Sequence, residues 1–90
     1  MAEGWRIVYT ADALKDKRRA VEAGLGDKIQ RLLKTIREDP FAAYPPYEKL
    51  VGDLAGLYSR RINWQHRLVY VVYEQERVVK IVSLWTHYER

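Results

Sequence analysis

The sequence contains no cysteine, only two histidines, and no long run of apolar residues. Without cysteine the chain cannot form disulfides or bind zinc through thiolates, and two histidines do not make a histidine-rich metal cage. We therefore expect neither a metal nor another cofactor. No stretch approaches the roughly 20 apolar residues of a membrane-spanning helix, and residues 1–4 lack the basic and apolar segments of a signal peptide. These absences predict a cytoplasmic protein that contacts no membrane.

Length and charge narrow the class of protein further. Ninety residues, 48% of them hydrophobic and 31% charged, fit a single domain over residues 1–90, because domains usually need about 50 to 200 residues. Sixteen Lys and Arg against twelve Asp and Glu give a net charge of +4. This excess favours a polyanionic partner, although many ordinary solvated surfaces carry as much.

The N-terminal half predicts a strand followed by two helices. Residues 5–9 are aromatic and β-branched, as is typical of a strand, and Thr10 can cap a helix over residues 11–23. The apolar positions along this helix and just beyond its end recur at helical spacing and are Leu14, Val21 and Leu25.

The second helix has the clearest apolar stripe in the sequence. We expect it to begin at Asp27, which with Gln30 resembles a capping box, and to end by Asp39, because Pro40 lacks an amide donor. Its stripe consists of Ile29, Leu32, Leu33 and Ile36.

The C-terminal half predicts a loop and then three antiparallel strands. Residues 41–47 contain two prolines and predict the loop, whereas residues 57–64, 67–73 and 77–85 are rich in Val, Ile, Tyr and Trp. The order β-α-α-β-β-β predicts a small α+β domain, in which two helices cover one face of a twisted, mainly antiparallel sheet. The other, open face can serve as a basic and aromatic platform for RNA.

Polar groups from three separate elements suit the cleavage of RNA. RNA carries its own nucleophile, so the protein needs a base near the 2′-hydroxyl, a cation on the phosphate and an acid for the leaving 5′-oxygen. In this hypothesis Glu48 is the base, Arg67 holds the phosphoryl oxygens and His87 is the acid, without a metal. Tyr88 positions the phosphate or supports His87. The products are a 2′,3′-cyclic phosphate and a 5′-hydroxyl.

Each of these residues also has an ordinary structural interpretation. Taken singly, Glu48 is a solvated carboxylate, Arg67 is an exposed strand residue, and His87 with Tyr88 belongs to a frayed terminus. The alternative function is therefore a non-catalytic module that binds RNA or the ribosome through the same basic sheet face.

Two adjacent arginines compete for the face of the sheet that carries Arg67. Arg60 and Arg61 point to opposite faces of their strand, so only one of them shares that face. A two-residue turn at Gln65-His66 selects Arg60, whereas a three-residue loop selects Arg61. The sequence leaves both turns open, and both arginines are candidates for binding RNA.

Four further residues have possible roles at the same surface. Lys49, beside Glu48, is another candidate for binding RNA. His66 falls in the expected hairpin turn, where solvated polar residues are normal, and it receives a secondary role at most. Trp64 and Trp85 can stack on bases, although large aromatic residues belong more often to cores or interfaces.

A set of residues spread over most of the chain matches a known family pattern. The set comprises Pro40-Phe41, Glu48, Leu50, Leu54, Gly56, Ser59-Arg60-Arg61-Ile62, His66-Arg67-Leu68-Val69-Tyr70 and His87-Tyr88. It resembles the YoeB/Txe toxins of the RelE superfamily. The resemblance implies a RelE-like fold and a bacterial type II toxin that enters the ribosomal A site, at the 16S rRNA, and cleaves the bound mRNA. It also implies a homodimer and a cognate antitoxin, which we expect to be acidic.

The resemblance assigns roles to residues by position. It places the family's catalytic glutamate on Glu48, the phosphate-binding arginine on Arg67 and the terminal pair on His87-Tyr88, and it favours Arg61 over Arg60. Three features depart from the family pattern: the loop before the glutamate lacks its usual glycines and adjacent proline, Trp85 replaces a basic residue, and Glu89-Arg90 extend the terminus. An antitoxin-binding remnant without catalysis is a third interpretation.

Overall fold

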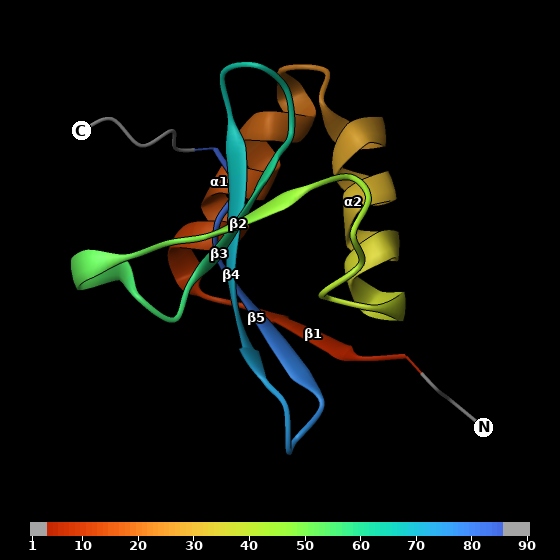
Figure 1. Ribbon diagram of the computed structural model, residues 1–90. Helices are drawn as coiled ribbons and strands as arrows, with labels where there is room; N and C mark the ends of the chain where they lie inside the picture. The colour runs from red at the N-terminus through yellow and green to blue at the C-terminus, as the bar shows by residue number, and fades with distance from the viewer. Residues whose placement is uncertain (1–3, 86–90) are drawn as a thin grey trace.

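The computed structural model describes residues 4–85, and within that range five strands form one sheet beside two α-helices (Figure 1). The elements in chain order are β1 (Arg6–Tyr9), α1 (Ala11–Glu22), α2 (Gly26–Glu38), β2 (Tyr47–Lys49), a 3-10 turn (Gly52–Leu54), β3 (Tyr58–Arg61), β4 (Arg67–Tyr73) and β5 (Val78–Ser83). The strands lie in the order β1-β5-β4-β3-β2. The β1–β5 pair is parallel and the other pairs are antiparallel, which confirms the predicted α+β fold with a mainly antiparallel sheet.

The edge strand β2 was not predicted. The sequence indicated a loop from residue 41 to residue 47, but Tyr47 begins a three-residue strand that pairs with β3. Three residues after two prolines are too few to show an alternating pattern, so this strand depends on its partner rather than on its own composition. The consequence is that Glu48 lies in the sheet, opposite Ser59.

The first helix begins as predicted but buries a different face. The hydroxyl oxygen of Thr10 accepts a hydrogen bond from the Ala13 amide at 3.0 Å, which confirms the N-cap. The buried residues, however, are Ala13 and Ala20, whereas Leu14 and Val21 are about half exposed. The predicted apolar face is therefore wrong, because two small side chains let the helix approach the core more closely than leucine would.

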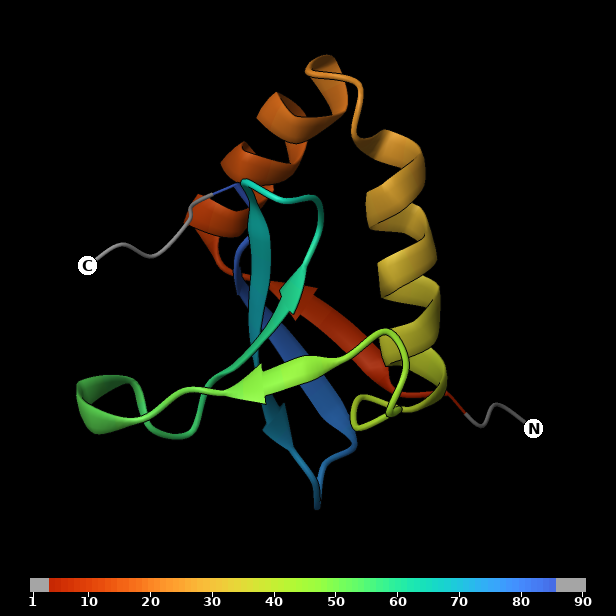
Figure 2. The same ribbon diagram turned by 45° about the horizontal axis from the view of Figure 1, so that its top comes forward.

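The second helix forms the main cover of the sheet (Figure 2). Its predicted stripe is confirmed, since all four apolar side chains are buried. The predicted capping box is wrong: Leu25 is the N-cap, and no side chain caps the helix. Instead Gly24, whose φ of 90° suits glycine, reverses the chain after α1, and Leu25 packs against the core. Within the described residues, neither helix is long and apolar enough to cross a membrane.

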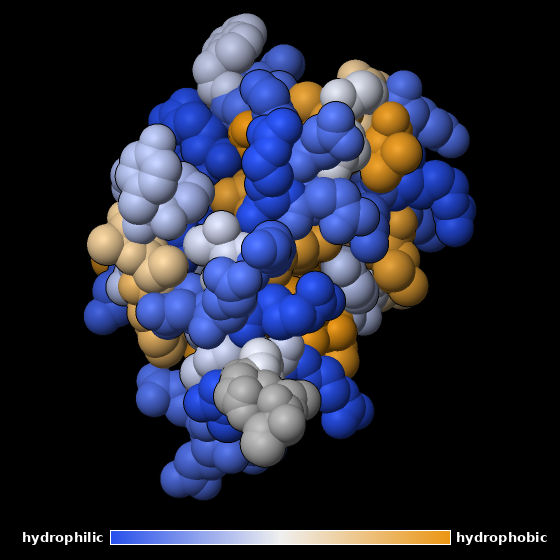
Figure 3. Space-filling view, turned by 90° about the vertical axis from the view of Figure 1, so that its right-hand side faces the viewer, coloured by the Kyte–Doolittle hydropathy of each residue, from blue (hydrophilic) through white to orange (hydrophobic). Residues whose placement is uncertain are grey.

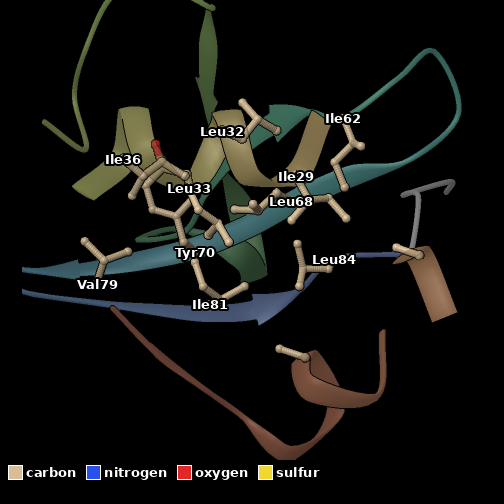
Figure 4. Close-up of a cluster of buried hydrophobic side chains, with 12 residues drawn as sticks. Ile29, Leu32, Leu33, Ile36, Ile62, Leu68, Tyr70, Val79, Ile81 and Leu84 are labelled. Atoms are coloured by element: carbon tan, nitrogen blue, oxygen red, sulfur yellow. The ribbon is translucent and has the colours of Figure 1, made fainter. Parts of the chain in front are cut away.

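The hydrophobic core lies between the helices and one face of the sheet, as Figure 4 shows. Leu68 and Tyr70 of β4 and Val79 and Ile81 of β5 meet the stripe of α2 there. Because side chains alternate along a strand, the intervening residues project from the opposite face. That face carries Arg67.

Candidate active site

The strand register brings the predicted polar residues onto one face of the sheet. Glu48 of β2 lies opposite Ser59 of β3, and Arg61 of β3 lies opposite Arg67 of β4. Ser59 and Arg61 are two residues apart and therefore share a face. Cross-strand neighbours have Cβ atoms about 5 Å apart, so the four side chains form one group.

Glu48 and Arg67 are in direct contact within this group. One nitrogen of Arg67, Nη1, lies 3.3 Å from Oε1 of Glu48 and donates a hydrogen bond of 3.1 Å to the Ser59 hydroxyl. The Glu48 side chain is 65% exposed and that of Arg67 is 22% exposed. An ion pair this exposed contributes at most about 1 kcal/mol to stability, so both charges remain available to a ligand.

The contact lies in an open hollow of about 400 Å³. Its walls are Pro45, Pro46, Tyr47, Glu48, Ser59, Arg61, Ile62 and Arg67. Of the predicted site residues, Glu48, Arg61 and Arg67 meet here. Ser59 was missed, although its place two residues before Arg61 on the same strand was a signal that could have found it.

Arg60 is buried on the other side of the sheet. Its side chain has 0% exposure, and its Nε donates to the Tyr70 hydroxyl at 2.9 Å. Its terminal nitrogens donate to the carbonyls of Ala42, at 2.9 Å, Pro40, at 3.1 Å, and Pro45. The prediction that Arg60 binds RNA does not fit this burial. Arg60 instead holds the loop that leads into β2.

An asparagine at the hairpin turn decides between the two arginines. The register pairs Arg61 directly with Arg67, so neither of the two turns considered forms, and residues 62–66 make a five-residue connection instead. Arg61 nevertheless shares the face of Arg67, as the three-residue loop would also have required. The side-chain oxygen of Asn63 accepts hydrogen bonds from the amides of Gln65, at 2.9 Å, and His66, at 2.7 Å. Such a bond from an asparagine to the backbone two residues on is a known turn-former and was a signal in the sequence.

His66 is not the solvated turn residue that the sequence predicted. It is 8% exposed and stacks on Trp85, with 4.0 Å between the ring centroids and 19° between the planes. Its Nδ1 also contacts the Trp85 carbonyl, which can only accept, so this nitrogen carries the proton. Trp85 therefore anchors the chain after β5 beside the hairpin. The predicted residues His87 and Tyr88 lie outside the described residues.

Lys49 and Trp64 lie near the hollow without lining it. Lys49 follows Glu48 in β2, so its exposed side chain projects to the other face of the sheet. Trp64 is 82% exposed, and its carbonyl accepts a hydrogen bond of 3.3 Å from Arg61.

The tyrosine that contacts Arg60 has a perturbed acidity. Burial raises the pKa of Tyr70, although the hydrogen bond and charge of Arg60 oppose this rise. The Tyr70 hydroxyl also donates to the Pro40 carbonyl at 2.8 Å, which requires the neutral phenol. Among residues 4–85, no three His, Asp or Glu side chains gather closely enough to hold a metal ion.

Known proteins resemble this chain in sequence and in fold. A sequence model of the YoeB-like toxins of bacterial type II toxin-antitoxin systems matches residues 9–88. A protein named Toxin YoeB from Streptomyces coelicolor is 38% identical over 85 residues, which cover 92% of this chain and 99% of that protein.

Solved structures of YoeB toxins also superpose on this chain. A YoeB/ParE toxin from Agrobacterium tumefaciens superposes with a TM-score of 0.84 at 32% identity, and the match covers 92% of this chain and 99% of that one. YoeB from Staphylococcus aureus was solved as a heterotetrameric YoeB-YefM toxin-antitoxin complex and is 37% identical to this chain. It superposes with a TM-score of 0.77, and the match covers 97% of this chain and 100% of that one. A YoeB dimer from Staphylococcus aureus, also 37% identical, superposes with a TM-score of 0.78, and the match covers 93% of this chain and 98% of that one.

Proposed function

Because this chain belongs to the YoeB-like toxins of bacterial type II toxin-antitoxin systems, we propose that it is an endoribonuclease that cleaves mRNA in the ribosomal A site. One observation carries the proposal: Arg67 lies 3.3 Å from Glu48 in an open hollow that Arg61 also lines. A base beside two guanidinium groups suits attack on a phosphodiester, since the cations stabilise the charge that develops on the phosphoryl oxygens.

The proposed reaction needs no group besides the chain's own side chains. Glu48 takes the proton of the 2′-hydroxyl, and the oxygen attacks the adjacent phosphorus while Arg67 and Arg61 bind the phosphoryl oxygens. The bond to the 5′-oxygen breaks, and His87 donates a proton to that leaving group. The products are a 2′,3′-cyclic phosphate and a 5′-hydroxyl.

The contact between Glu48 and Arg67 fits a site that awaits its substrate. When a phosphate enters, its oxygens can replace the carboxylate as the partner of Arg67, and the freed carboxylate can accept a proton. The hydrogen bond to Ser59 holds Arg67 throughout. Trp85, two residues before His87 in the sequence, stacks on His66 beside the hairpin that leads into Arg67. This position of Trp85 supports the choice of His87 as the acid.

The same proposal includes the partners. YoeB from Staphylococcus aureus is found with the antitoxin YefM and as a dimer, so we infer that this chain binds a cognate acidic antitoxin and forms homodimers. The net charge of +4 suits both 16S rRNA and an acidic antitoxin. The family match over residues 9–88 supports one toxin domain, and ribosomes as substrate carriers imply a cytoplasmic location.

The test is cleavage of a defined mRNA on purified ribosomes by the wild-type chain and by Glu48→Gln, which keeps the size of the side chain and removes the base. We expect cuts in phase with codons and cyclic phosphate ends from the wild type, and at least a 100-fold slower reaction from the variant. The matched control is Glu76→Gln, in the exposed turn between β4 and β5. Ribosome binding without cleavage by the wild type would instead indicate the non-catalytic module.

A further inference from the structure

A second hollow, of about 480 Å³, adjoins the candidate active site. Its walls come from α2, from the loop before β2 and from the end of β3, and they are Lys28, Arg31, Leu32, Thr35, Tyr44, Pro45, Arg61 and Ile62. It shares Pro45, Arg61 and Ile62 with the first hollow. The two hollows are therefore neighbours across Arg61. Figure 3 shows the α2 side of the molecule, where hydrophilic side chains surround small apolar patches.

The walls of this second hollow combine positive charge with apolar surface. Lys28 and Arg31 are three residues apart on α2, so they lie on one face of the helix, and both are exposed. Arg61 adds a third cation, and none of the lining residues is acidic. Leu32 and Ile62 are buried and form an apolar floor. Cations around an apolar floor suit a ligand with a phosphate and a flat base.

Tyr44 gives the second hollow an aromatic rim. The other aromatic residues around this loop pack together, with Phe41, Tyr47 and Tyr58 at ring-centroid distances of 5.5 to 6.3 Å from one another. Tyr44 is 83% exposed. Packing therefore does not account for a tyrosine here, whereas exposed aromatic rings are the surfaces on which proteins stack unpaired bases.

We propose that the second hollow binds the nucleotide next to the bond that is cleaved, with Tyr44 stacking on its base and with Lys28 and Arg31 binding its phosphate. The position of that bond rests on the proposed function at Glu48 and Arg67. A single strand that crosses from one hollow to the other passes Arg61, the cation of the shared wall. This continuity favours RNA over an acidic protein segment, which the cations alone would also suit.

The test of the aromatic rim compares two oligomers that cannot be cleaved: a 2′-O-methyl oligoadenylate and the same backbone without bases. We expect Tyr44→Ala to weaken binding of the oligoadenylate about 5- to 100-fold, as loss of base stacking does, and to leave the base-free oligomer unchanged. Tyr44→Phe keeps the ring and should bind as the wild type does. Tyr73→Ala removes another exposed tyrosine, at the end of β4, and is the matched control. Fluorescence anisotropy measures all the affinities.

The test of the cations uses the same oligomers over a range of salt concentrations. The double variant Lys28→Ala/Arg31→Ala should weaken binding of both oligomers and reduce the slope of log affinity against log salt by about 0.7, since each neutralised phosphate on a single strand contributes about 0.7 and both cations bind the same phosphate. Lys34→Ala is the control, because Lys34 lies on the same helix, where it pairs with Glu38 at 3.4 Å, and does not line the hollow.

Four results would overturn the inference. Tyr44→Ala could weaken both oligomers equally or neither, or the double variant could keep the wild-type slope. The variants could also lose only the binding of an acidic antitoxin peptide, which would identify a protein as the occupant. None of these measurements needs cleavage. A wild-type chain that fails to cut mRNA on ribosomes would remove the proposed function, while the oligomers would still decide whether this hollow binds a nucleotide.

Discussion

Arg60 shows how one buried side chain can position a site that it does not touch. A buried guanidinium must have its N–H groups hydrogen-bonded, because an unpaired one costs much free energy in a dry interior. Arg60 satisfies them with the Tyr70 hydroxyl and three carbonyls of the loop over residues 40–45, and its guanidinium also lies 5.0 Å from the ring centre of Tyr47. Tyr47 immediately precedes Glu48, so Arg60 holds the segment that carries the proposed base.

Replacing Arg60 should therefore destabilise the whole chain. Arg60→Met keeps the length of the side chain but leaves the Ala42 and Pro45 carbonyls and the Tyr70 hydroxyl without their donor, while the Pro40 carbonyl keeps the hydrogen bond from Tyr70. We expect the free energy of unfolding to fall by about 2 to 4 kcal/mol. Urea unfolding measures the loss. Arg61→Met, on the exposed face, is the control and should change stability by no more than about 0.5 kcal/mol. Equal losses in the two variants would contradict the structural role of Arg60.

At the scale of elements, the hairpin between β3 and β4 depends on one side chain. A shift of the register by one residue would turn Arg61 to the core and Arg60 to the surface. Asn63 prevents that shift, since its oxygen holds two successive amides of the turn. The face on which each arginine lies is thus decided by the turn and not by the strands.

The loss of that oxygen should weaken the hairpin. Asn63→Ala removes two hydrogen bonds, each contributing about 0.5 to 1.5 kcal/mol, so we expect the free energy of unfolding to fall by about 1 to 3 kcal/mol and the proposed cleavage to slow with it. Asn63→Asp retains an acceptor and should keep most of the stability. Thermal unfolding, with the exposed Gln65→Ala as control, measures the difference. A stable Asn63→Ala chain would mean that the register has another cause.

The elements differ in how far the sequence could predict them. The stripe of α2 and the cap at Thr10 were predictable, because each depends on contacts within a few residues of the chain. The buried face of α1 was not, since Ala13 and Ala20 are too small to stand out beside Leu14 in a hydrophobic pattern. Strand β2 was not predictable either, because it depends on pairing with β3, which is a separate segment of the chain.

The candidate site, like the fold, could be predicted from the sequence only in part. Its chemistry, a carboxylate with arginines, could be predicted from residue types, and the contact of Glu48 with Arg67 stays within that prediction. The choice of Arg61 over Arg60 needed the register. His66 was predicted wrongly because its neighbour, Trp85, comes from the distant segment that follows β5. Contacts between distant segments leave no local pattern in a single sequence.

At the scale of the whole molecule, one loop joins the core to both hollows. Pro45 belongs to the wall of each hollow, while the Pro40 carbonyl accepts hydrogen bonds from Tyr70 and Arg60 inside the molecule. Tyr70 itself packs in the core with the stripe of α2. A change in the state of this one phenol therefore affects the fold and the binding surface together.

The pH dependence of unfolding should report on that phenol. Burial raises the pKa of Tyr70 in the folded chain, whereas the unfolded chain ionises its tyrosines near the ordinary value of about 10. Below pH 10 both states keep the proton and stability is unaffected. As the pH rises above about 10, the unfolded state alone loses the proton, so the free energy of unfolding should fall progressively until the folded pKa is reached.

Tyr70→Phe separates this effect from that of other groups. The variant lacks the hydroxyl, so it should be less stable than the wild type at pH 8, where two hydrogen bonds are lost, but its stability should fall less steeply between pH 9.5 and 11. Urea unfolding at several pH values measures both slopes. Tyr73→Phe, on an exposed tyrosine, should keep the wild-type slope. Parallel curves for the wild type and Tyr70→Phe would show that ionisation of this buried phenol does not limit the alkaline stability of the chain.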